Sequence, residues 1–264
     1  MSGWSPRHGE GYVEKHMKKK CLRQSRASVD FDIAGKSLSG SETDRDYVDY
    51  LWEENDHYGP LGVVVGNISG HGEDAELLMV SAGAFFRVLA SRDQSIDRIV
   101  TEMNQYFTLE LQDNGWLISL LVLVVDPESR RIRWVRAGHE QVLLYNTANG
   151  VFQELEGNGS AIGADKTMRF HEHFIEIPPD GRLISVVTDG LWKRRDKNEP
   201  MFGENRFREI IREHAAGSAA DILDAVFFEL QRFSSGREPE EDTTLIVIKV
   251  NAVDPIQIGD WKFN

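Results

Sequence analysis

Polar and acidic residues stand at the ends of several apolar runs in this sequence, where they could hold a cation. Three of these positions border runs of branched apolar residues, and they are Asn67, Asp189 and the pair Glu241-Asp242. A carboxylate at the mouth of a buried strand is held rigidly, which suits a metal ligand. Hard divalent ions such as Mg²⁺ and Mn²⁺ take oxygen ligands. The spacing therefore predicts a cation site, with Asp46 and Asp49 as further candidates.

Composition narrows the classes of protein that this chain can belong to. The 264 residues include 30 basic and 43 acidic ones, a net charge of −13, so we expect no nucleic-acid partner. The longest apolar run, 117–125, is too short to span a bilayer, which predicts no membrane span. Cys21 is the only cysteine and excludes an intrachain disulfide. A chain without disulfides suits a reducing compartment, and we expect a cytoplasmic protein.

Hydrophobic periodicity predicts the elements that must position these residues. Helical spacing predicts helices at 78–89, 96–107, 204–214 and 219–233. Alternating or continuous apolar residues predict strands at 29–35, 47–52, 61–65, 116–125, 130–135, 141–145, 151–155, 168–177, 183–187 and 244–250. Many consecutive strands with helices in pairs predict an α+β layered domain. We expect this domain at 28–250, after a basic leader at 1–27 and before a C-terminal tail at 251–264.

Five short motifs occur in a fixed order along the predicted domain. They are Asp44-Arg45-Asp46-Tyr47-Val48-Asp49, Asn67-Ile68-Ser69-Gly70-His71-Gly72, Ala137-Gly138-His139, Thr188-Asp189-Gly190 and Glu241-Asp242-Thr243-Thr244. Their order and rough spacing resemble the bacterial branch of the metal-dependent (PPM-type) serine/threonine protein phosphatases, the sporulation-protein-E and stress-response regulator type. The resemblance covers about residues 28–250.

This resemblance implies a fold, a cofactor and a reaction. The fold would be two stacked antiparallel sheets flanked by pairs of helices. The cofactor would be a pair of Mn²⁺ or Mg²⁺ ions, whose bridging hydroxide attacks a phosphoserine or phosphothreonine, so no protein nucleophile is needed. The implied partner is a phosphorylated regulatory protein such as an anti-sigma-factor antagonist. A homodimer formed through the leader is a further alternative.

Two residues of this chain differ from the metal ligands that the family resemblance implies. Asp46 and Asp189 match ligand aspartates, but Asn67 replaces the aspartate that bridges both metals, and Glu241 replaces the first aspartate of the last motif. An amide oxygen carries no charge and cannot bridge two ions through two oxygens. Asp242 could substitute for Glu241 after a one-residue shift. One metal or none therefore remains an alternative to two.

Other residues around the motifs bear on phosphate binding and catalysis. Arg45 replaces a glycine and could either pair with Asp46 or grip a phosphate, and Gly70 and Gly72 permit close backbone approach. His71 is a candidate catalytic side chain. Lys193 stands where an acidic residue is common in the family.

Two functional hypotheses follow from these departures. The first is an active phosphatase with an altered, weakened metal site. The second is a degenerate phosphatase that binds a regulatory partner without turnover.

Overall fold

The computed structural model describes residues 21–25, 31–40, 45–51, 59–92, 94–126, 128–157, 159–196, 200–235, 237 and 239–251. The strands are β1 (Cys21–Ser25), β2 (Phe31–Leu38), β3 (Tyr47–Leu51), β4 (Leu61–Ile68), β5 (Ile118–Asp126), β6 (Arg131–Ala137), β7 (Val142–Asn146), β8 (Val151–Leu155), β9 (His173–Glu176), β10 (Arg182–Val187) and β11 (Thr243–Val250). The helices are α1 (Glu73–Ala90), α2 (Ile96–Gln112), α3 (Gly190–Lys193), α4 (Glu204–His214) and α5 (Ala219–Phe233).

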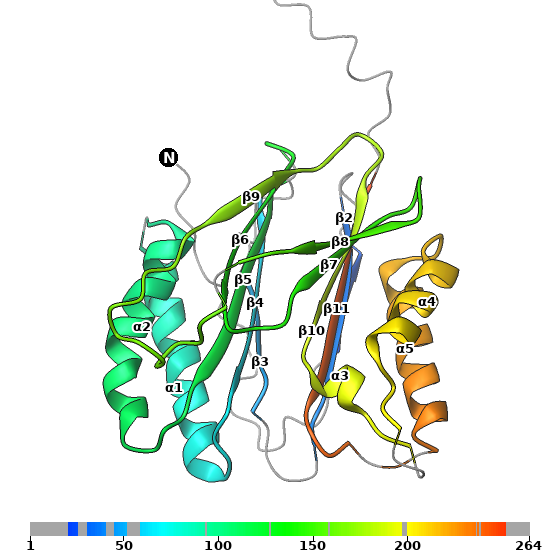
Figure 1. Cartoon of the computed structure of the whole chain (residues 1–264). Helices are drawn as coiled ribbons and strands as arrows, with labels where there is room; N and C mark the ends of the chain where they lie inside the picture. The colour runs from blue at the N-terminus through cyan, green and yellow to red at the C-terminus, as the bar shows by residue number, and fades with distance from the viewer. Residues whose placement is uncertain are drawn as a thin grey trace, which may run out of the picture.

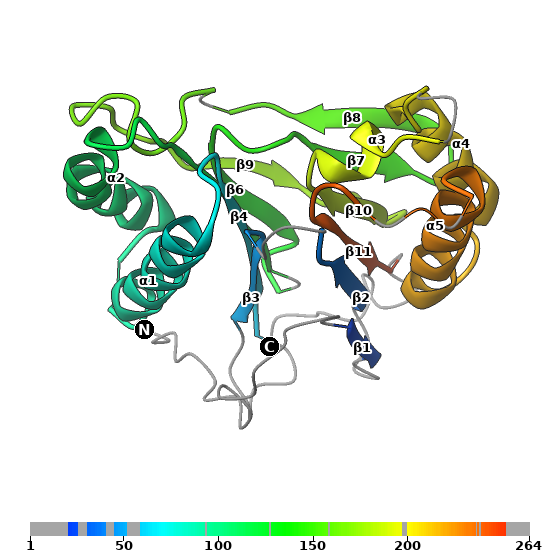
Figure 2. The same ribbon diagram turned by 90° about the horizontal axis from the view of Figure 1, so that it is seen from below.

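Two antiparallel sheets form the centre of the molecule. One sheet has the strand order β1-β2-β11-β10-β7-β8 and the other has the order β3-β4-β5-β6-β9. Figure 1 shows the sheets face to face, with α1 and α2 outside one and α4 and α5 outside the other. The view from below in Figure 2 shows the same four layers. The predicted sandwich of two sheets flanked by helix pairs is confirmed.

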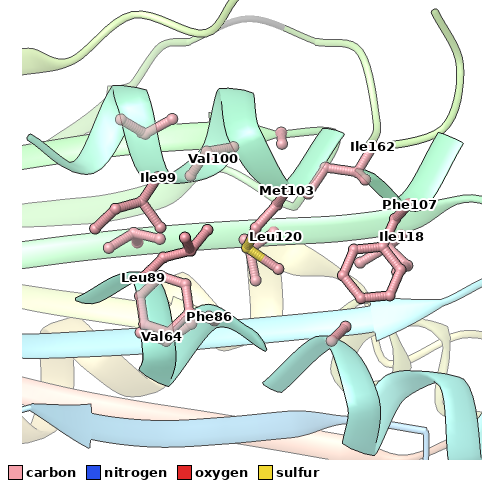
Figure 3. Close-up of a cluster of buried hydrophobic side chains, with 14 of the residues drawn as sticks. Val64, Phe86, Leu89, Ile99, Val100, Met103, Phe107, Ile118, Leu120 and Ile162 are labelled. Atoms are coloured by element: carbon pink, nitrogen blue, oxygen red, sulfur yellow. The ribbon is translucent and has the colours of Figure 1, made fainter. Parts of the chain in front are cut away.

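The continuous apolar runs belong to strands that are buried on both faces. In β4, Val63 and Val65 pack between the two sheets, whereas Val64 faces α1 and α2. In β11, Ile246 likewise faces the other sheet and Leu245 faces α4 and α5. Because side chains alternate across a strand, a strand between two apolar layers needs no polar face. Figure 3 shows the layer between the helices and β4 and β5, where Phe86, Met103 and Leu120 meet.

Most predicted elements are confirmed, and the differences occur in short or polar segments. The helices α4 and α5 have the predicted bounds, and Ser218 and Asp221 form a capping box at the start of α5. The strand predicted at 168–177 is shorter, since β9 spans only His173–Glu176. The four-residue helix α3 was not predicted.

The segment interpreted as a basic leader contributes a strand to the fold. β1, Cys21–Ser25, pairs antiparallel with β2, so the sheet extends into residues 1–27. The rest of the predicted leader, and residues 252–264 of the predicted tail, lie outside the described residues.

In the part of the chain that the structure describes, no helix is both long enough and apolar enough to cross a membrane.

Candidate functional site

A cleft of about 400 Å³ lies where several strands of both sheets begin or end. β4 ends beside it, β10 leads into α3, and β11 starts there; α3 marks this end of β10 in Figure 1. Its charged lining consists of Arg45, Glu140, Asp189, Lys193, Glu241 and Asp242. We call it the acidic cleft because it has four carboxylates and two cationic groups. The structure thus brings together five of the predicted site residues, Arg45, Asn67, Asp189, Glu241 and Asp242.

Asp46 lies beside the acidic cleft, and neighbouring side chains satisfy both of its carboxylate oxygens. The amide Nδ2 of Asn67 donates to Asp46 Oδ1 over 2.5 Å. The hydroxyls of Thr188 and Thr244 donate to Asp46 Oδ2 over 2.9 and 2.7 Å. Burial raises the pKa of Asp46 to about 6, and these hydrogen bonds oppose that rise. In the metal centre that the resemblance implies, Asn67 and Asp46 would both be ligands. Here the Asn67 amide instead donates a hydrogen bond to the Asp46 carboxylate.

Asp242 holds the chain that enters β3. Its Oδ2 accepts from the backbone N–H of Arg45 over 2.5 Å and from that of Asp46 over 3.0 Å. Its Oδ1 accepts from the N–H of Gly40 over 2.6 Å. Only 3% of Asp242 is exposed. A buried carboxylate with three backbone donors is fully engaged, so Asp242 fixes the position of Asp46.

Asp189 and Glu241 lie on either side of the ammonium group of Lys193. Lys193 Nζ lies 2.6 Å from Asp189 Oδ2 and 3.7 Å from Glu241 Oε2. The hydrogen bond to Asp189 opposes the effect of partial burial and raises the pKa of Lys193, which keeps it charged. A cation thus lies within 4 Å of two carboxylates that the family resemblance assigned to metal binding.

Arg45 does not form the ion pair with Asp46 that is one of the two expectations for this side chain. Its Nη1 donates to the carbonyl oxygen of Gly70 over 3.1 Å. Gly70 itself must be a glycine, because a Cβ there would lie 2.6 Å from the ring of Trp116. This contact joins the start of β3 to the turn before α1 and leaves Arg45 at the wall of the acidic cleft.

His139 is the most strongly perturbed base at the acidic cleft. It is 4% exposed, and burial lowers its pKa to about 4, so the ring is neutral at pH 7. The neighbouring Glu140 has its pKa raised, first by burial and then by the charge of Asp189. The charge of Asp189 thus acts on both side chains, and in each case it raises the pKa.

Three other candidates lie away from the acidic cleft. His71 and Gly72 are exposed and do not line it. Gly72 has a φ of 82° just before α1, a conformation that favours glycine. Asp49 instead forms a bidentate ion pair with Arg87 of α1, with contacts of 2.6 and 2.8 Å. Asp49 thus ties β3 to α1.

Sequence reasoning missed the hydroxyl groups of Thr188 and Thr244 as partners of Asp46. Both belong to quoted motifs, but their contacts join residues 142 and 198 positions apart. It also missed that residue 190 must be a glycine, because a Cβ at this position would collide with the backbone carbonyl of Asp242.

Comparison with known proteins identifies the family of this chain. The family model "Stage II sporulation protein E (SpoIIE)" matches residues 58–251. The chain therefore belongs to the SpoIIE family, a branch of the metal-dependent serine phosphatases that its motifs resemble.

Two curated relatives are similar in sequence to most of this chain. "Protein IcfG" of Synechocystis sp. is 23% identical over 256 residues, covering 87% of this chain and 38% of that protein. "Phosphoserine phosphatase RsbP" of Bacillus subtilis is 21% identical over 241 residues, covering 90% of this chain and 57% of RsbP. The chain thus spans well under two thirds of either relative.

Solved structures agree on the fold. The RsbU and RsbW domains of Rv1364c from Mycobacterium tuberculosis align with a TM-score of 0.68 and 22% identity, over 86% of this chain and 63% of that one. RsbX in complex with magnesium aligns with a TM-score of 0.65 and 13% identity, over 88% of this chain and all of RsbX. The fold is therefore one that holds magnesium in a relative.

The polar contacts of this chain do not fit a two-metal centre. Among the residues that the structure describes, no three His, Cys, Asp or Glu side chains converge as a metal-binding group. The oxygens of Asp46 and Asp242 already accept hydrogen bonds from the protein, and Asp189 already pairs with Lys193. The donor set is thus arranged around internal hydrogen-bond donors and one lysine.

Proposed function

We propose that this chain is a SpoIIE-family domain that binds a phosphorylated regulatory protein without the family's two-metal hydrolysis. The hydrogen bond from Asn67 to Asp46 carries this proposal. A bridging ligand must present oxygen lone pairs to two cations, whereas Asn67 presents its N–H to the neighbouring carboxylate. The position that the family uses to join two ions is neutral here.

Lys193 supports the same proposal. Its ammonium lies between Asp189 and Glu241 and compensates part of their charge. A single positive charge on a tethered side chain cannot lower the pKa of a water molecule as two divalent ions do. The fold and its partner-binding surface would survive this replacement, whereas the hydrolytic step would not.

The chemistry of the relatives supports the nature of the partner. RsbP is by name a phosphoserine phosphatase, and in Rv1364c an RsbU domain and an RsbW domain occur in one protein. We infer a phosphoserine-bearing regulatory protein, such as an anti-sigma-factor antagonist, as the partner of this chain. A cytoplasmic location and a homodimer belong to the same proposal.

Weak hydrolysis with one divalent ion is the second candidate function. The carboxylates of Asp189 and Glu241 favour it, because each keeps a negative charge and both lie at the acidic cleft. A Mn²⁺ ion that displaced the half-exposed Lys193 side chain would find two carboxylate ligands.

Phosphate release and peptide binding separate the two functions. The protein is mixed with a peptide that carries one phosphoserine, in Mn²⁺ and in EDTA, and both phosphate and fluorescence anisotropy are measured. We expect binding of the phosphorylated peptide over its serine form, and no phosphate release. Asp189→Asn is the control variant. Mn²⁺-dependent release above that of Asp189→Asn would overturn the proposal in favour of the weak enzyme.

A further inference from the structure

A second cleft, of about 230 Å³, adjoins the acidic cleft on the other side of Lys193 and Glu241. Its charged lining consists of Lys193, Arg194, Arg195, Arg237, Glu240 and Glu241. We call it the basic cleft because four cationic residues stand against two glutamates. The whole chain has a net charge of −13, so this local excess of positive charge is opposite in sign to the overall charge.

The charge of the two clefts decides which of them suits a phosphate monoester. Without divalent ions the four carboxylates of the acidic cleft repel a phosphate dianion. The basic cleft has the opposite balance, and arginine guanidinium groups bind phosphate oxygens through paired N–H donors. A phosphoryl group is therefore expected in the basic cleft.

The side chains of the basic cleft combine one fixed group with two accessible ones. Arg194 is held in place by hydrogen bonds to the Ser234 hydroxyl and the Arg237 carbonyl. The side chains of Lys193 and Arg237 are each 50% exposed. Arg237 contacts Glu240 over 3.2 Å, an exposed ion pair of the kind that contributes little stability. An incoming phosphate can take the place of this glutamate at little cost.

We propose that the basic cleft binds the phosphate monoester of a phosphoserine, beside the family's metal position and independently of divalent ions. This inference rests on the proposed function for the identity of its partner. Lys193 serves both clefts, since it compensates Asp189 on one side and presents positive charge on the other.

An NMR titration of the whole chain with inorganic phosphate in EDTA tests the location. We expect the amide signals of Lys193, Arg195 and Arg237 to shift with increasing phosphate. Shifts confined to Asn67 and His139 of the acidic cleft, or no shifts at all, would overturn the inference.

A matched pair of glutamate variants tests the charge argument. Glu240 and Glu229 each contact an arginine three residues away, but only Glu240 lines the basic cleft. Glu240→Gln should tighten phosphate binding about two- to fivefold, because it removes an exposed competing charge. Glu229→Gln should leave it unchanged. Equal effects of the two variants would contradict a local site.

A second arm distinguishes free phosphate from a protein-borne phosphoserine. Arg237→Ala should weaken binding of both inorganic phosphate and the phosphoserine peptide about fivefold, whereas Arg232→Ala should weaken neither. A phosphoserine site binds the peptide more tightly than inorganic phosphate, and the reverse order would overturn it. If the chain instead hydrolyses the peptide, the proposed function fails, while the phosphate shifts still decide the location.

Discussion

The acidic and basic clefts share Lys193 and Glu241 but differ in their charge. Carboxylates predominate in the acidic cleft, and cationic side chains predominate in the basic cleft. In the acidic cleft, backbone N–H groups engage Asp242 and a lysine engages Asp189, and beside the cleft threonine hydroxyls and an asparagine amide engage Asp46. The basic cleft instead places half-exposed cations at the surface. The comparison teaches that two adjoining clefts of one fold can carry opposite charge, and our proposals assign anion recognition to the basic one.

Restoring the ligands of the acidic cleft should have the largest effect. The triple variant Asn67→Asp, Glu241→Asp, Lys193→Glu returns the family's charges and removes the resident cation. We expect Mn²⁺-dependent phosphate release to rise about a thousandfold or more above the parent, because two cations stabilise the charge of the transition state. Adding Asp189→Asn should abolish the gain. A triple variant as inactive as the parent would show that ligand loss is not the cause.

Gly190 lines the basic cleft and should tolerate no side chain. Its Cβ would collide with the backbone carbonyl of Asp242, which cannot move without displacing the loop that it anchors. Gly190→Ala should lower the free energy of unfolding by about 3 kcal/mol, measured by urea denaturation. Gly159→Ala is the control, since no heavy atom lies within 4 Å of its Cβ position. Equal losses in both variants would contradict the packing at Gly190.

Folding shifts the pKa values of His139 and Asp46, near the acidic cleft, and the two shifts should change stability with pH in opposite directions. The pKa of His139 falls from 6.5 to about 4 on folding, so the unfolded chain binds its proton first and stability falls as pH drops below 6.5. The pKa of Asp46 rises from 3.8 to about 6, so the folded chain binds its proton first and stability rises as pH drops through 6.

Single variants should separate these two contributions. From pH 7 to pH 5, protonation of His139 in the unfolded chain lowers the free energy of unfolding by about 2 kcal/mol. Over the same range, protonation of Asp46 in the folded chain raises it by about 1 kcal/mol. Relative to the parent, His139→Gln should therefore lose less stability on acidification and Asp46→Asn should lose more. Urea denaturation at pH 5, 6 and 7 measures this. Parallel curves for both variants would contradict the burial of these groups.

The last expected effect concerns metal affinity. Lys193→Ala removes the cation that lies between Asp189 and Glu241, and we expect Mn²⁺ to bind about tenfold more tightly, by calorimetric titration. The exposed Lys166 lines neither cleft, and Lys166→Ala should leave Mn²⁺ affinity unchanged. Unchanged affinity in Lys193→Ala would mean that the lysine does not compete with a metal.

Much of the fold could be predicted from the sequence, because its strongest patterns come from layers buried on both sides. The runs at β4, β5 and β11 are apolar throughout, since each strand contacts apolar side chains on both faces. The helix α3 has only four residues, too few to show a helical period. β1 is short and polar, CLRQS, and depends on pairing with β2.

The site was less predictable than the fold. Ordered motifs identified residues of the acidic cleft, because each motif borders a strand end. The partners of those residues were not predictable, since Asp46 meets Thr188 and Thr244 only through the stacking of the two sheets. The basic cleft joins residues 193–195 to residues 237–241, and no local pattern links these segments.

A crystal structure determined with Mn²⁺ and anomalous scattering tests the central claim most directly. The account predicts that the Asn67 amide stays on Asp46, that Lys193 stays between Asp189 and Glu241, and that no pair of ions appears in the acidic cleft. Two Mn²⁺ ions about 3.5–4 Å apart, with Asn67 between them, would contradict it.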